Sequence, residues 1–318
     1  IYLEARDGSG RIIDQYTLRI DEEEMETGPP ETNSSLAVTG SDSTLTVACD
    51  NNISLLFDKS TGHLRSIMNN GNEIVLSGPF FNLRTRGRSV IYSYHEIMEY
   101  TGWKLLGFSW EESAGHVIIH STGLCADSIS VDLMTTISAD AAMIIRYSAS
   151  GIPAGYIREL GIGFNLENAI DAISWKRDPY WSYYPEEHLS SAEGTSGLYP
   201  TKLKSYRSTP PKDWAFDTKS FYYDGTVDED AGNRLVNRAK GTKENIREYS
   251  LLKDGSKVLT VTSDGQAHCR LSKTGDTLRL FISSELDYVD LSWGNYQRNI
   301  EAESEYAGEL SVKFFDNR

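Results

Sequence analysis

The sequence predicts an all-β fold built as a large antiparallel sandwich. Apolar and polar residues alternate along many short segments, which is the pattern of half-buried strands. Turn-forming sequences such as DKSTG, NNGN and SDG separate these segments. No long segment keeps a clean helical period, and strands do not alternate with helices as they do in parallel α/β folds.

The chain divides into three predicted parts. Residues 1–20 are typical of a β-hairpin that turns at DGSG. Residues 21–36 are acidic, carry two prolines and include almost no large apolar residues, which is a linker composition. Residues 37–318 form the main domain. Because a lone hairpin is only marginally stable, residues 1–20 are expected to be the end of a truncated domain or a ribbon packed on the main body.

Four segments of the main domain show the alternation most clearly, and one side of each is expected to face the core. The expected core residues are Leu45, Val47 and Cys49; Ile129, Val131, Leu133, Thr135 and Ile137; Leu278, Leu280 and Ile282; and Leu310, Val312 and Phe314. The best helical candidate is NRLVNRAKGTKENIREYSLL, residues 233–252, although Gly241 interrupts it.

Charge and composition exclude several classes of partner and cofactor. The net charge of −15 argues against nucleic acid and anionic membranes as partners. No apolar run approaches the ~18 residues that a membrane span needs. The three cysteines Cys49, Cys125 and Cys269 lack zinc-ligand spacing and are expected to be buried thiols. The sequence does not decide whether two of them form a disulfide. Asp228 and Asp230 lack the full spacing of a calcium loop. We therefore expect no cofactor and no metal.

The densest aromatic stretch is WKRDPYWSYYPEEH, residues 175–188. Pro179 and Pro185 bracket YWSYY, so a continuing helix is excluded there. Trp175 ends an alternating run and is expected in the core, whereas Trp181 is expected at the surface. Flat aromatic rings suit the C–H faces of pyranoses, and nearby polar groups bind hydroxyls. The alternative is a packed corner of the sheet. The candidate carbohydrate-binding residues are Trp181, Tyr183, Tyr184, Glu186, Glu187, His188, Trp214 and Trp293.

Several motifs resemble the C-terminal domain of family-two glycoside hydrolases of the β-galactosidase type. RELGIGFNL, ISWKRDPYWSYYPEEH and KENI followed by VTSDGQAHCRL are similar to its later strands. In contrast, NLRTRGRSV lacks the acidic segment that the family often has there. The opening of that domain is matched by ISLLFDKSTGHLRSIMNNGNEIVLSGPFFNLRTRG, in which the matching residues are Phe57, Asp58, Lys59, Thr61, Gly62, Leu64, Ser66, Gly78, Pro79, Asn82 and Arg84.

The resemblance implies a galactose-mutarotase-like supersandwich, preceded by a hairpin from an immunoglobulin-like domain. In that family, catalysis resides in a separate TIM barrel that carries two glutamates. This chain has no eightfold strand–helix alternation to supply a barrel, so it is expected to be inactive by itself. The implied partners are the catalytic barrel and a galactoside-like glycan, and the implied location is periplasmic or extracellular in a bacterium.

Two alternative functions remain open from the sequence: a stand-alone carbohydrate-binding module and an independent sugar mutarotase or epimerase. Ring opening needs a general acid and a general base, typically a histidine and a carboxylate. The candidates are His95 beside Glu96 and His188 beside Glu187. Adjacency in sequence does not establish that such groups face each other across a substrate.

Overall fold

The structure is a computed structural model that describes residues 2–17, 36–49, 52–86, 97–113, 115–167, 169–179, 191–197, 242–274, 277–286 and 300–315. Within these ranges every regular element is a β-strand and every strand pair is antiparallel. No helix in the described residues has the length and apolar character to cross a membrane. The all-β, antiparallel prediction is therefore confirmed.

The strands follow one another in this order: β1 (Tyr2–Arg6), β2 (Ile12–Thr17), β3 (Ala37–Gly40), β4 (Thr44–Ala48), β5 (Ile53–Asp58), β6 (His63–Asn69), β7 (Asn72–Arg86), β8 (Ile97–Tyr100), β9 (Trp103–Ser113), β10 (His116–Cys125), β11 (Ile129–Ser138), β12 (Ala142–Ser150), β13 (Tyr156–Glu167), β14 (Ala172–Arg177), β15 (Glu193–Gly197), β16 (Lys243–Lys253), β17 (Ser256–Thr274), β18 (Thr277–Leu286) and β19 (Glu305–Phe314).

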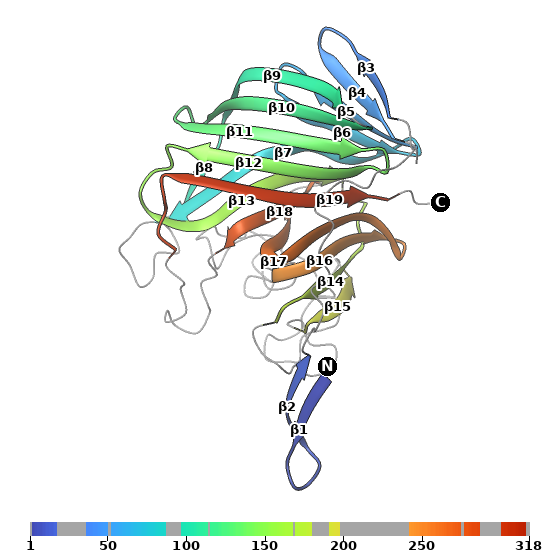
Figure 1. Cartoon of the computed structure of the whole chain (residues 1–318), viewed down its shortest axis with the longest axis vertical. Helices are drawn as coiled ribbons and strands as arrows, with labels where there is room; N and C mark the ends of the chain where they lie inside the picture. Colours follow the sequence, from blue (N-terminus) through green and yellow to red (C-terminus); the bar gives the residue numbers. More distant parts are fainter. Residues whose placement is uncertain are drawn as a thin grey trace.

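β1 and β2 form a two-stranded sheet of their own, which has no pairing with the other described strands (Figure 1). Side chains on both strands are exposed, including Tyr2, Leu3 and Ile13. Residues 18–35, which hold most of the predicted linker, lie outside the described residues. The assignment of residues 1–20 to an immunoglobulin-like domain, of 21–36 to a linker and of 37–318 to one domain stays a prediction.

The strands from β3 to β19 belong to one sheet that closes on itself, and most of them lie in two layers (Figure 1). One layer has the order β9-β10-β11-β12-β19, and the other contains β3-β4-β5-β6-β7-β13-β18. β17 belongs to both layers, because Leu259–Thr262 pair with β19 and His268–Thr274 pair with β18. The layers meet at Tyr147 of β12. Its ring lies 6.2 Å from that of Phe81 on β7, and its hydroxyl lies 2.6 Å from the Ser284 hydroxyl on β18.

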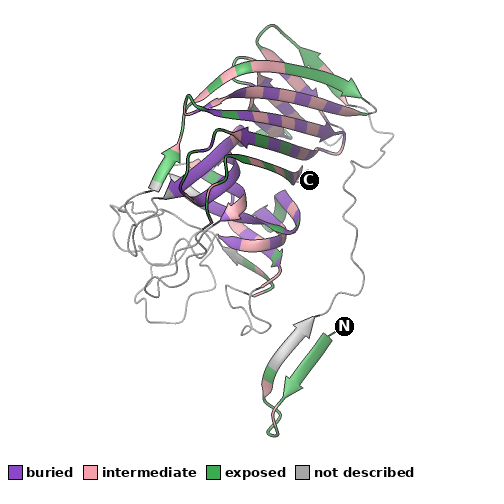
Figure 2. Cartoon of the chain, turned by 60° about the vertical axis from the view of Figure 1, so that its left-hand side comes forward, coloured by how far each residue is buried: buried purple, intermediate pink, exposed green. Residues whose placement is uncertain are grey.

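The core lies between these layers and contains the residues that the alternation predicts. All the expected core residues of the four segments are buried. Figure 2 shows this alternation as purple and pink bands along the layer that contains β10 and β11, at the top of the view. Trp175 on β14 is also buried, as predicted. The three cysteines are buried free thiols, as expected, and no disulfide joins them.

The helical candidate is wrong where the structure describes it, because Lys243–Lys253 form β16. β16 lies between β14 and β17 and pairs with both. Ile246, Tyr249 and Leu251 are fully buried there. Burial of these side chains between layers outweighs the weak helical preference of the local sequence, since most secondary-structure stability comes from tertiary packing.

Candidate functional site

The candidate site is a hollow of about 280 Å³ beside β7, at a place where the sheet opens. β7 pairs with β6 up to Gly78 and with β8 from Leu83 onward. In the described structure, residues 79–82 have no strand beside them on that side. We call this the arginine hollow, and its described lining residues are His63, Phe80, Phe81, Asn82, Leu83, Arg84, Glu99, Tyr100, Thr101, Gly102, Trp103, Cys125, Asn165, Arg270, Arg279 and Phe281.

The alternation along β7 divides its side chains between the core and this site. Phe81 and Leu83 belong to the core. Phe80, Asn82 and Arg84 therefore point to the opposite face of the sheet. On that face the register brings together residues that are far apart in the sequence, because β13, β18 and β17 follow β7 in the sheet.

Gly163 lets aromatic rings cover the middle of this face. It pairs with Phe80 on β7 and with Phe281 on β18. A Cβ atom at this position would lie 2.5 Å from carbons of the Phe80 ring, well inside van der Waals contact. The two rings meet edge to face, with centroids 6.3 Å apart. A side chain at Gly163 would therefore displace the aromatic wall of the hollow.

A buried ion-pair cluster lies beside these rings. Glu159 on β13 is fully buried and accepts two hydrogen bonds from Arg270 on β17, at 2.6 and 2.9 Å. Asn82 Nδ2 donates to the same carboxylate at 3.4 Å, and Arg84 Nη1 lies 3.7 Å from it. Burying a charge is costly unless it is paired and hydrogen-bonded. Glu159 meets both conditions and fixes both guanidinium groups.

The two arginines also reach outward from the cluster. Arg84 Nη2 lies 3.0 Å from Glu99 Oε1, and the Glu99 side chain is 58% exposed. The guanidinium carbon of Arg270 lies 4.1 Å from the centre of the Phe281 ring, which is a cation–π contact. The hollow thus combines flat apolar surface with fixed hydrogen-bond donors.

His63 and Trp103 form another wall of the hollow. Their rings stack with centroids 5.0 Å apart, and Trp103 Nε1 donates a hydrogen bond of 2.7 Å to the Thr61 carbonyl. Burial lowers the pKa of His63 from 6.5 to about 4, because the charged imidazolium loses its hydration. Near neutral pH the ring is therefore uncharged.

This pKa predicts a pH dependence of stability. The unfolded chain binds a proton at His63 below about pH 6.5, whereas the folded chain binds it only near pH 4. Stability should therefore fall as the pH drops through this window, by about 3 kcal/mol from this residue. His63→Phe keeps a ring on Trp103 and removes the titration. Urea unfolding between pH 4 and 7 should give a flatter profile for the variant, and parallel profiles would contradict the assignment.

None of the eight candidate carbohydrate-binding residues predicted from the sequence lies in the described part of the chain. Trp181, Tyr183, Tyr184, Glu186, Glu187, His188, Trp214 and Trp293 therefore stay predictions. The same holds for His95, Glu96, Asp228 and Asp230. His120 is described, and its Nε2 lies 2.8 Å from Asp132 Oδ2 on the solvent-facing side of β10 and β11, away from the arginine hollow.

The sequence interpretation missed Glu159, Arg270, Phe80 and Phe281 as site residues. Asn82 and Arg84 were noted only as part of the family resemblance. A usable signal was present in RELGIGFNL, where glycines at alternate positions mark a place where a strand is approached closely from one face.

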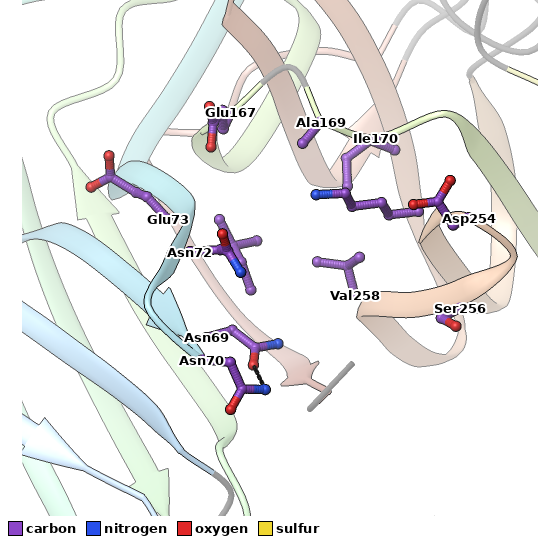
Figure 3. Close-up of a pocket in the computed structure, with 12 residues that line it drawn as sticks. Asn69, Asn70, Asn72, Glu73, Glu167, Ala169, Ile170, Asp254, Ser256 and Val258 are labelled. Atoms are coloured by element: carbon purple, nitrogen blue, oxygen red, sulfur yellow. Dashed lines mark hydrogen bonds between the residues drawn. The ribbon is translucent and has the colours of Figure 1, made fainter. Parts of the chain in front are cut away.

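A second hollow, of about 250 Å³, lies between the β6–β7 and β16–β17 turns (Figure 3). Asn69, Asn70 and Asn72 lie across it from Ile170 and Val258. The amides hold the turn in place, since Asn70 Nδ2 donates to Asn69 Oδ1 and Asn69 Nδ2 donates to the Phe315 carbonyl. No aromatic side chain lines it within the described residues, and these contain no cluster of metal-ligating side chains. The arginine hollow is therefore the better ligand site.

No family model and no curated protein matches the chain. Solved structures do align with 90% of it. Galactose 1-epimerase from Lactobacillus acidophilus NCFM aligns over 99% of its own chain, with 11% identity and a TM-score of 0.39. The GalM/aldose epimerase homologue from C. elegans aligns over its full chain, with 10% identity and a TM-score of 0.35. A β-arabinopyranosidase aligns over 39% of its chain, with 11% identity and a TM-score of 0.38.

Proposed function

We propose that the chain is a carbohydrate-binding, non-catalytic region of a glycoside hydrolase of the β-galactosidase type, and that it binds sugar in the arginine hollow. The observation that carries this proposal is the pairing of an aromatic wall, Phe80 and Phe281, with the fixed polar groups of Asn82, Arg84 and Arg270. Ligand sites typically combine apolar walls with a few placed polar groups in this way. Pyranose rings have apolar C–H faces and a rim of hydroxyls that match both parts.

The family resemblance supports the same place. Asn82 and Arg84 are two of the residues on which the resemblance rests, and both line the hollow. In the intact enzyme, this region would pack against the catalytic barrel. Such packing would put the hollow within reach of the glycan that the barrel cleaves.

The chemistry of the hollow favours binding over hydrolysis. Retaining glycosidases need two carboxylates about 5–5.5 Å apart across the glycosidic bond. Among the described lining residues, Glu99 is the one carboxylate. Glu159 lies below the surface of the hollow, where Arg270 holds it in a two-point ion pair. A carboxylate held this way is a structural anchor for the arginines.

The proposal predicts that Phe80→Ala weakens binding to carbohydrate. Phe80 is half-buried, so its truncation removes a wall of the hollow with a limited loss of packing. The measurement is retention on a printed array of plant, microbial and animal glycans. We expect the wild-type chain to bind a restricted set of glycans and the Phe80→Ala chain to lose at least about tenfold in affinity for them, which corresponds to about 1.4 kcal/mol.

Phe108→Ala is the matched control. Phe108 is a half-buried phenylalanine on β9 that packs against the core and does not line the hollow. This variant should keep the wild-type glycan profile, and thermal melts should show that both variants are folded. Wild-type binding that survives Phe80→Ala, or no glycan binding at all, would contradict the proposal. Catalysed exchange of the anomers of free galactose would contradict the non-catalytic role.

A further inference from the structure

We infer that the arginine hollow selects an acidic sugar, one whose ring carries a carboxylate. The inference rests on the proposed function and names the class of sugar for the same site. Among the described residues, three arginines line the hollow, Arg84, Arg270 and Arg279, against one carboxylate, Glu99. With the buried Glu159, the described residues of the hollow carry three positive and two negative formal charges, a balance of one positive charge. The chain as a whole carries −15.

The ion pair between Glu99 and Arg84 shows how a carboxylate binds in the hollow. Glu99 Oε1 lies 3.0 Å from Arg84 Nη2 at the mouth, while the Arg84 side chain is only 5% exposed. Glu99 itself is mostly in solvent, on the four-residue strand β8 that is paired with β7. Ion pairs with an exposed partner contribute little to stability. A ligand carboxylate can therefore take the place of Glu99 at small cost.

Arg279 supplies charge that the protein does not neutralise locally. It is exposed on β18, two residues before Phe281, and therefore on the same face of the sheet. Within the described residues no carboxylate lies within ion-pair distance of it, in contrast to Arg146 and Arg247, whose guanidinium groups pair with Glu309 and Asp178. Phe281 is buried with the Arg270 guanidinium over its ring, so a sugar would rest on the half-buried Phe80, which lies between Arg279 and the ion-pair cluster in the register of the sheet.

The two hollows differ in the sign of their net charge. In the second hollow (Figure 3) the charges of the described lining residues are reversed, since three carboxylates, Glu73, Glu167 and Asp254, lie there with one cation, Lys253. An acidic sugar is therefore attracted to the first hollow and repelled by the second, and screening by salt should weaken this discrimination. The charge contrast assigns the acidic ligand to one place on the chain.

The test is calorimetric titration of the wild-type chain with four probes, the methyl glycosides of glucuronic and galacturonic acid and of their neutral parents, glucose and galactose. We expect one acid to bind at least about tenfold more tightly than its neutral parent at low salt. Raising the salt from about 50 to 300 mM should reduce this ratio. Arg279→Gln should reduce the ratio several-fold. Glu99→Gln should raise it, because the competing carboxylate is gone.

Lys253→Gln is the control, because it removes one cation from the second hollow and should leave the ratio unchanged. A neutral parent that binds as tightly as its acid would overturn the inference and leave the proposed function standing. An acid-to-neutral ratio that does not respond to Arg279→Gln or Glu99→Gln would also overturn it. If neither the acids nor the neutral sugars bind, the proposed function fails as well.

Discussion

Glu159→Gln is expected to destabilise the fold by about 3–5 kcal/mol, the usual cost of removing one partner from a buried ion pair. The substitution keeps the shape of the side chain and removes its charge. Arg270 and Arg84 are themselves buried and would lose the carboxylate that they share. Urea unfolding followed by tryptophan fluorescence measures the loss.

Glu309→Gln is the matched control for this prediction. Glu309 Oε2 lies 2.6 Å from Arg146 Nε, the same separation as between Glu159 Oε1 and Arg270 Nε. However, the Arg146–Glu309 pair is about half exposed. Exposed pairs contribute about 0–1 kcal/mol, so this variant should lose little stability. Equal losses in the two variants would mean that burial does not strengthen the Glu159 cluster.

Trp175→Ala is expected to cost about 3–5 kcal/mol, the range for truncating a buried aromatic residue. Trp175 is 5% exposed, and its Nε1 donates a hydrogen bond of 3.0 Å to the Ser191 carbonyl. The Lys243 ammonium lies 4.3 Å from the centre of its ring. Gly194 pairs with it on β15, where an added Cβ would lie 2.3 Å from the indole. The truncation therefore empties a tightly enclosed space.

A thermal melt should show a midpoint for Trp175→Ala that is roughly 10 °C below that of the wild type. Trp110 on β9 is the comparison, because 37% of it is exposed. Trp110→Ala should move the midpoint by no more than a few degrees. A small shift at Trp175 would contradict the core position that both its alternation and its contacts indicate.

The sequence predicted the strands and the core because both depend on local alternation. Leu278, Leu280 and Ile282 alternate with other residues, and the structure buries all three. Trp175 was placed correctly for the same reason. The helical candidate was wrong because a local pattern does not say which strands will enclose a segment, and β16 is enclosed by β14 and β17.

The site was much less predictable than the core. Glu159 and Arg270 are 111 residues apart in the chain and are brought together by the order of β13, β18 and β17. Nothing in the sequence near either residue encodes that order. The density of aromatic residues instead indicated Trp181 and its neighbours. Gly161 and Gly163 of β13 were a signal of the site in the local sequence. Each lies against a neighbouring strand, where a side chain would collide.

The most direct test of the account follows the arginine side chains during sugar binding. In two-dimensional NMR spectra, the Nε–Hε signals of Arg84, Arg270 and Arg279 report on the hollow, and that of Arg146 reports on an exposed ion pair elsewhere on the sheet. Titration with the methyl glycoside of galacturonic or glucuronic acid should shift the three signals of the hollow along one saturable curve and leave that of Arg146 in place. A saturable titration in which none of the three signals moves would contradict carbohydrate binding at the arginine hollow.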